Sequence, residues 1–280
     1  MLSLECSTAA VAFELASAQC EPLQETVTVC RLETLGIMLV AALLGGCALP
    51  RASTDGSTYV SLTPFSQALP GAVLPGGWQP WILAKFKRPT AYDMVREGGA
   101  TVVHAQADAS ASGLLHTLAE LDPRRYRDLG WQWKIEQLIK AQDNTRRATE
   151  DAPARVIVKF GGDRAKLDFG ERAFAAKVKA MTGYEMPHAT LMYIWARDSA
   201  LETVIPNHHT DRVKMIVAES GPDKLGAWHA FKRDLYADFR RAFAEEPGPI
   251  IGVGIMTDTD NTGEQVRAWY GDITLRVARD

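Results

Sequence analysis

Cysteine is absent from the whole chain beyond residue 47. The four cysteines are Cys6, Cys20, Cys30 and Cys47, so residues 48–280 can form neither a disulfide nor a thiolate-metal site. The sequence also lacks a phosphate-binding loop, a dinucleotide-binding fingerprint and a zinc-binding helix motif. It therefore gives no motif support to nucleotide-dependent or zinc-dependent chemistry.

An excess of charge of either sign is also missing once the N-terminal segment is set apart. The chain holds 31 basic and 34 acidic residues, and its first 46 residues account for five of the acids and for one base, Arg31. The remainder then carries 30 basic against 29 acidic residues. This balance argues against nucleic acid and against strongly acidic ligands as partners.

The N-terminal segment has the pattern of a bacterial lipoprotein signal. Residues 35–47 form an apolar run that is too short to cross a bilayer but suits the apolar region of a signal peptide. Its end, Leu44-Gly45-Gly46-Cys47, matches a lipobox, with an aliphatic residue, two small residues and the cysteine that receives lipid. The alternative is a buried N-terminal helix that ends at the two glycines.

Residues 1–46 are accordingly interpreted as a signal peptide. Residues 1–28 contain no Lys or Arg, so the true translation start is expected near residues 27–38. Lipidation of Cys47 would anchor the protein to a membrane through that residue alone. Residues 47–77, rich in Pro, Ser, Thr and Gly, are interpreted as a lipid-anchored tether. No aspartate follows Cys47, which favours the outer membrane, facing the periplasm or the exterior.

From Trp78 onward the pattern predicts one mainly β domain over residues 78–280. Short alternating segments bounded by turn residues predict strands, and Trp131-Gln132-Trp133-Lys134-Ile135 alternates most clearly. Residues 92–96 and 101–107 predict a hairpin. Together the segments favour an antiparallel β-sandwich of jelly-roll type with two packed helices.

The two helices are predicted from apolar residues at helical spacing. The first covers residues 170–181, and the second covers residues 228–242 with the stripe Trp228, Phe231, Leu235, Phe239 and Ala242. A final strand is expected to turn Trp269, Gly271, Ile273, Leu275 and Val277 toward the core.

Several sequence phrases resemble the bacterial family catalogued as domain of unknown function 3047. The likeness extends from about Trp78 to Leu275, with a mild departure at Glu150-Asp151, where the family often has two aspartates. It implies an uncharacterised secreted or envelope protein and supplies no activity. The matching phrases are Trp131-x-Trp133-Lys134, residues 150–156, Ala189-Thr-Leu-Met-Tyr193-x-Trp195 and residues 256–262, together with Trp228 and the helix that carries Asp238 and Phe243.

The loop that begins at Asp258 is the candidate metal site. Asp258, Asp260 and Thr262 place oxygen atoms at alternate positions before Gly263, as in a calcium loop. However, Trp269 stands where a calcium loop of the helix-loop-helix type has a bidentate Glu. The alternative to a structural calcium is an Asx-rich turn that hydrogen-bonds its own backbone.

Five tryptophans are candidates for contact with a glycan ligand. Trp131, Trp133 and Trp195 lie on the more apolar faces of their strands, so core packing is the favoured alternative for these three. Trp78 and Trp81, beside Pro80, are expected to be more exposed.

Carboxylates supply the catalytic candidates Glu150, Asp151 and Asp238, which could meet Asp258 and Asp260 in space. The preferred hypothesis is a lipid-anchored envelope protein that binds a glycan or another envelope component without altering it. The alternatives are a polysaccharide hydrolase or lyase that uses these carboxylates, and a structural or assembly lipoprotein that binds a protein partner.

Overall fold

The computed structural model describes residues 59–60, 62–71 and 73–278, all within the compact unit Thr54–Asp280. The predicted signal peptide and Cys47 lie outside the described residues. Among those residues, no helix is long and apolar enough to cross a membrane.

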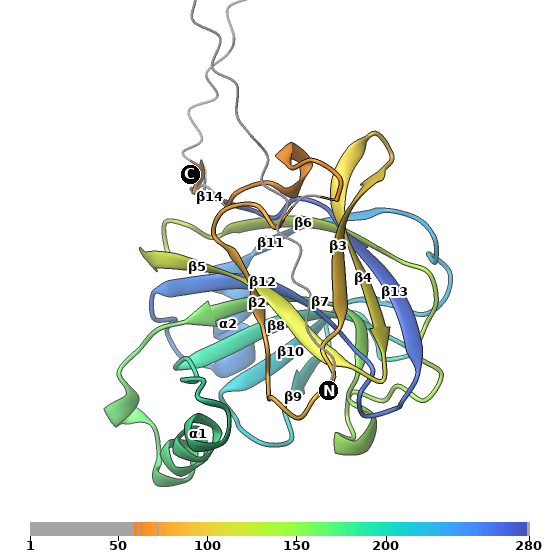
Figure 1. The fold of residues 1–280 in the computed structure, drawn as a ribbon. Helices are drawn as coiled ribbons and strands as arrows, with labels where there is room; N and C mark the ends of the chain where they lie inside the picture. Colours follow the sequence, from red (N-terminus) through yellow and green to blue (C-terminus); the bar gives the residue numbers. More distant parts are fainter. Residues whose placement is uncertain (1–58, 61, 72, 279–280) are drawn as a thin grey trace, which may run out of the picture. The chain divides into compact units, whose positions relative to one another are not determined.

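The described residues form two packed β-sheets, called sheet A and sheet B, and two helices (Figure 1). Sheet A contains β1 (Tyr59–Val60), β3 (Ala91–Glu97), β4 (Ala100–Asp108), β6 (Asp128–Ile135), β11 (His229–Asp234), β13 (Gln265–Tyr270) and β14 (Thr274–Arg276). Sheet B contains β2 (Trp78–Trp81), β5 (Ala111–Leu121), β7 (Ala152–Phe160), β8 (Ala189–Ala196), β9 (Val204–Pro206), β10 (Val213–Ser220) and β12 (Ile250–Asp258).

The predicted antiparallel β-sandwich of jelly-roll type with two helices is confirmed. The strand order is β1-β14-β6-β13-β4-β3 in sheet A, where β11 also pairs with β6. In sheet B it is β2-β5-β12-β7-β8-β10-β9. The β8–β10 pair is parallel and departs from the antiparallel pattern.

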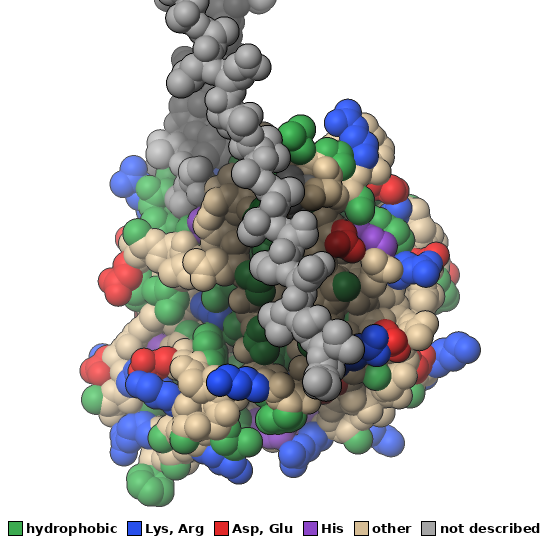
Figure 2. Space-filling model, viewed as in Figure 1, with side chains coloured by type: hydrophobic (Ala, Val, Ile, Leu, Met, Phe, Trp, Pro, Cys, Tyr) green, Lys and Arg blue, Asp and Glu red, His purple; other side chains and the backbone are tan. Residues whose placement is uncertain are grey.

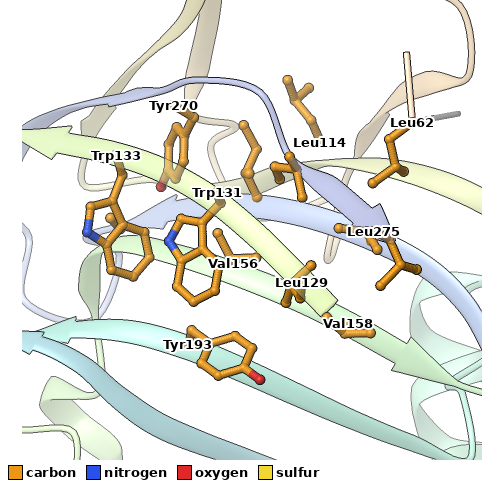
Figure 3. Close-up of a cluster of buried hydrophobic side chains, with 14 of the residues drawn as sticks. Leu62, Leu114, Leu129, Trp131, Trp133, Val156, Val158, Tyr193, Tyr270 and Leu275 are labelled. Carbon is orange, nitrogen blue, oxygen red and sulfur yellow. The ribbon is translucent and has the colours of Figure 1, made fainter. Parts of the chain in front are cut away.

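Alternating side chains from both sheets fill the space between them (Figure 3). Trp131 and Trp133 of β6 point from sheet A toward Val156 and Tyr193 of sheet B. The ring centroids of Trp131 and Tyr193 lie 4.8 Å apart. Each large side chain buried in this way contributes about 1.5–3 kcal/mol to folding, so the core is the main source of stability.

The second predicted helix begins seven residues later than expected. Residues 229–234 form β11, which pairs with the free edge of β6, and only Leu235–Phe243 form α2. Asp234 ends the strand and caps the helix, because its side chain accepts a hydrogen bond from the backbone N–H of Ala237. Apolar residues at 228, 231 and 235 fit either structure, so their spacing alone could not decide between strand and helix.

The first predicted helix is present as α1 (Phe169–Thr182), which lies to one side of the strands (Figure 1). Asp168 caps its N-terminus through the N–H of Glu171, and Gly183, with a φ of 73°, ends it. Ala175 is its one fully buried residue among those described. Helix α1 therefore buries few of its side chains against the rest of the protein.

Two further expectations differ from the structure. The sandwich begins earlier than residue 78, because β1 pairs with β14, and Leu62 and Phe65 are buried in the core. The segment predicted as a tether over residues 47–77 therefore overlaps the folded domain. In β13 the core side chains are Val266, Ala268 and Tyr270, so Trp269 lies on the outer face. The break between β13 and β14 shifts the alternation, which returns Ile273 and Leu275 to the core.

Candidate functional site

Three carboxylates that are distant in the sequence meet where β12 ends. Asp151 precedes β7, and Asp258 and Asp260 lie at and beyond the end of β12. One oxygen from each lies within 4.8 Å of the others. The pairing of β12 with β7, which places Asp258 opposite Ala152, brings these residues together.

Asp258 is held by a buried ion pair with Arg155. Its Oδ1 and Oδ2 accept hydrogen bonds from Nε and Nη2 of Arg155 at 2.7 and 3.0 Å, and Oδ1 also accepts from the N–H of Ala152. Burial raises the pKa of Asp258 to about 6, against the lowering effect of Arg155. The carboxyl is therefore ionised at neutral pH and matched by one cation. Burial also opposes the charge on Arg155, but Asp258 outweighs it and the pKa of Arg155 is raised.

Asp151 closes the loop that follows β12. It is fully buried, and its carboxylate accepts from the N–H groups of Asn261 and Thr262 and from the Thr262 hydroxyl. Asp260 forms an ion pair of 2.6 Å with Lys87. These carboxylates thus tie together three segments of the chain.

These contacts modify the calcium prediction. Asp258 and Asp260 do converge, but Asp151 is the third acid of the cluster, whereas the Thr262 hydroxyl donates to Asp151. Calcium requires six to eight oxygen ligands, and here a guanidinium, an ammonium and backbone N–H groups already surround the carboxylates. The arrangement favours a hydrogen-bonded turn, and calcium remains a prediction.

The catalytic candidates separate into two places. Glu150 lies near the acidic cluster, with the amide of Asn207 3.4 Å from its carboxylate. Asp238 belongs to α2 instead, where it accepts hydrogen bonds from Tyr193, Arg233 and Arg241. That network joins α2 to β8 and β11, so Asp238 has a structural role and does not meet the other acids.

The cluster lies at one end of the outer face of sheet B, the face that points away from the core. Arg155 and Lys159 of β7 share this face, and four residues of strand separate them by about 13 Å. Gly252 and Gly254 of β12 and Gly113 of β5 place no side chain on it. A Cβ atom at Gly254 would come within 2.7 Å of the Leu114 carbonyl oxygen, so the close pairing of these strands requires glycine.

Lys159 occupies the other end of this face. Its Nζ lies 3.9 Å from the ring centroid of Trp81 and 4.6 Å from that of Tyr184. The side chain is 96 % buried, and Nζ has no hydrogen-bond partner among the described residues. Burial lowers the pKa of Lys159 to about 7. The two rings offer the ammonium group an attraction that replaces part of its lost hydration.

The five candidate tryptophans are divided by the structure. Trp131, Trp133 and Trp195 are at most 3 % exposed and pack in the core, as the alternative interpretation had it. Trp78 is 5 % exposed and donates from Nε1 to the Thr63 carbonyl, so its expected exposure is wrong. Its inward position on β2 faces Phe65, a contact that the tether interpretation did not foresee. Trp81 alone of the five is half-buried, on the outer face of sheet B.

Arg155, Lys159 and Tyr184 were missed as site residues. The sequence carries a signal for the first two, because they alternate with Val156 and Val158 on a strand whose inward residues are all apolar. Nothing local in the sequence indicates that Tyr184, in the segment after α1, returns to this face.

A family model matches residues 76–274 of the chain, and its description is "Protein of unknown function (DUF3047)". The chain belongs to this family. The resemblance seen in the sequence is thereby confirmed for the family, whose description names no activity. No curated protein matches the chain.

Solved structures similar to this DUF3047 protein include modules and enzymes. The family 11 carbohydrate-binding module of a Clostridium thermocellum cellulase has 9 % identity and a TM-score of 0.39, with 80 % of this chain and 96 % of that chain covered. A cyclase from Fischerella sp. has 12 % identity, a TM-score of 0.38 and coverage of 79 % and 97 %. Endoglucanase 3 of Trichoderma harzianum has 6 % identity, a TM-score of 0.35 and coverage of 74 % and 100 %.

The Arg155–Asp258 pair can be tested with a double-mutant cycle. Arg155→Met leaves a buried carboxylate without its cation and should lower the free energy of unfolding by about 3–5 kcal/mol. The double variant Arg155→Met/Asp258→Leu should lose much less than the two single losses combined. Urea unfolding measures all four proteins. Additive losses would show that the two side chains act independently.

The buried amine of Lys159 predicts a pH-dependent stability. Below about pH 7 the amine is protonated in both the folded and the unfolded chain. From about pH 7 to 10.4 the unfolded chain binds a proton that the folded chain lacks, so this group raises the free energy of unfolding by up to about 1.4 kcal/mol per pH unit.

Lys159→Met removes this dependence. The variant should therefore be more stable than the native protein at pH 6, and the difference should shrink steadily toward pH 10. Urea unfolding at pH 6, 8 and 10 measures it, and Lys177→Met, at an exposed position of α1, is the control. An effect of Lys159→Met that is equal at every pH would contradict the buried, unpaired amine.

Proposed function

We propose that this protein binds a glycan without altering it, through the outer face of sheet B around Trp81. The observation that carries the proposal is the half-buried pair of Trp81 and Tyr184, whose ring centroids lie 5.8 Å apart. Aromatic rings beside a few polar groups are typical of ligand sites, and their faces suit the C–H surfaces of sugar rings.

The surroundings of Trp81 support this proposal. Gly113 lies directly under the Trp81 ring, where a Cβ atom would come within 3.1 Å of it, so glycine allows the ring to lie flat against sheet B. The buried ammonium group of Lys159 lies against both rings and helps to hold them in place. The two rings are thus held against sheet B by the groups around them.

The state of the carboxylates favours binding over hydrolysis. Hydrolysis of a glycosidic bond needs two carboxyl groups, about 5–10 Å apart, that are free to exchange protons or attack the substrate. Asp151 and Asp258 lie close enough, but both are buried and fully engaged in holding loops. Asp260 is paired with Lys87. We therefore place binding before catalysis.

Charge on the visible face is mixed, and this also shapes the proposal. In Figure 2 basic and acidic side chains alternate over the surface in view, without a large region of one sign. This agrees with the near balance of charges beyond residue 46. Neutral glycans therefore come first among the ligands to be tested.

Trp81→Ala tests the proposal directly. The native protein should be retained by at least one polysaccharide in a panel of mixed-linkage β-glucan, xylan, mannan, starch, alginate and peptidoglycan, and Trp81→Ala should weaken that retention about tenfold or more. Phe169→Ala, an exposed aromatic side chain at the start of α1 and outside the proposed face, is the control. Retention and new reducing ends are measured in the same tubes, with calcium and then with chelator.

The outcomes separate the alternatives. Retention without new sugar ends supports a binding protein, and loss of retention in chelator would support calcium near Asp258. New sugar ends would favour a hydrolase or lyase. Equal retention of the native protein and Trp81→Ala would contradict the proposed face, and no retention at all would favour a lipoprotein with a protein partner.

We also propose that Cys47 carries a lipid that anchors the protein in the bacterial outer membrane. The lipobox at residues 44–47 supports this proposal. Radiolabelled palmitate should label the native chain in cells and should not label Cys47→Ser, and the variant should move from the membrane fraction to the soluble fraction. Labelling that persists in Cys47→Ser would contradict the assignment.

A further inference from the structure

A row of side chains crosses the outer face of sheet A, opposite in direction to the face around Trp81. Trp269 of β13 lies directly across from His104 of β4 and Lys134 of β6. The rings of His104 and Trp269 stack with centroids 4.7 Å apart, and Nζ of Lys134 lies 4.1 Å from the Trp269 centroid. The indole of Trp269 therefore has a protein group on each side, and the three side chains form a rigid row across the sheet.

A cavity of about 260 Å³ lies beside this row of side chains. Gln106 and Arg267, which line it, each lie two residues from a member of the row, so they share its face at a distance of about 7 Å. The cavity has room for several water molecules. The full lining is Gln106, Ala107, Asp108, Gln137, Gln265, Val266 and Arg267.

Three glutamine side-chain amides line this cavity and provide hydrogen-bonding groups. Their Nε2 groups donate to protein oxygens: Gln106 to Asp93, Gln137 to the Gln265 carbonyl and Gln265 to Asp108. Their Oε1 atoms accept no hydrogen bond within the described part of the chain. An amide carbonyl has two acceptor positions, so these three oxygens can receive several hydroxyl donors.

The charges at the cavity are balanced. Asp108 forms an ion pair of 2.7 Å with Arg88, and Arg267 forms one of 3.2 Å with Glu136. Hydrogen bonds from Gln265 and then Arg88 lower the pKa of Asp108, so it stays an acceptor at neutral pH. With each charge paired, the cavity favours a neutral ligand rich in hydroxyl groups over an ion.

We propose that this cavity is a second glycan site, which takes one unit of a neutral polyhydroxylated chain. The proposal rests on the proposed function for its ligand class, but it uses other residues and the other sheet. Because the two sites lie on outward faces of opposite sheets, one protein molecule would hold two glycan chains at once.

The test uses the purified full chain and a neutral hexasaccharide panel of gluco-, xylo- and manno-oligosaccharides. Binding is measured by calorimetry for the native protein, Trp81→Ala, Gln106→Ala/Gln265→Ala and the combination. Gln67→Ala, at an exposed position outside the cavity, is the control. Side-chain amide signals of Gln106, Gln137 and Gln265 are followed by NMR, assigned by the loss of each signal in the Gln→Ala variants.

We expect Trp81→Ala to retain binding with one site where the native protein has two, and Gln106→Ala/Gln265→Ala to weaken that remaining binding about tenfold. The three amide signals should shift with the hexasaccharide in native protein and in Trp81→Ala. All three glutamines are at the surface or half-buried, so the variants should keep the native melting temperature.

Other results would show which of the two proposed sites is wrong. Complete loss of binding in Trp81→Ala, with unmoved glutamine signals, would overturn the second site and leave the proposed function in place. Binding that depends on the glutamines but not on Trp81 would overturn the proposed face and support the cavity. Absence of binding by the native protein to every probe would contradict both.

Discussion

The buried pair of Arg155 and Asp258 is the constraint on which the candidate site depends. It joins β7 to the end of β12, at the point where the register between the two strands shifts. Arg155 also donates to the Glu150 carbonyl oxygen, which fixes the chain before Asp151. Asp151 can then hold the amides of the following loop. One guanidinium thus positions two acidic segments that are about a hundred residues apart in the sequence.

This pair also explains why a cluster of acids can exist in a mostly apolar environment. Buried like charges repel one another, and each loses its hydration. Arg155 offsets the charge of Asp258, Lys87 that of Asp260, and backbone N–H groups surround Asp151. The acids therefore act as structural ties. A site for catalysis would instead leave at least one carboxylate free to change its protonation or its partner.

The sandwich itself could be predicted from the sequence because its signals are local. Alternation of apolar residues predicted the strands around Trp133 and Val158, and apolar residues at helical spacing predicted α1. The errors arose where two structures share one pattern. Trp228, Phe231 and Leu235 suit a helix, but the open edge of β6 takes residues 229–234 as a strand. That edge is a tertiary feature, which no local pattern contains.

The candidate site could be predicted only in part, for the same physical reason. Asp151 was expected as a possible neighbour of Asp258 and Asp260, and these three do converge, whereas Asp238, which was grouped with them, does not. The role of Arg155 depends on strand pairing, and that of Tyr184 on how the segment after α1 folds back over sheet B. Trp78 and Trp81 show the limit most clearly. Three positions apart on β2, they point to opposite faces, and the sequence does not state which face is the core.

Lys159 distinguishes the outer face of sheet B from an ordinary covered sheet. A buried ammonium without a hydrogen-bond partner reduces stability, and two aromatic rings recover only part of the lost hydration. Methionine would fill the same space at lower cost, as Met192 and Met256 do on the same face. The amine therefore makes the folded chain less stable than a methionine at this position would. It lies against Trp81 and Tyr184, the two rings on which the proposed ligand face depends.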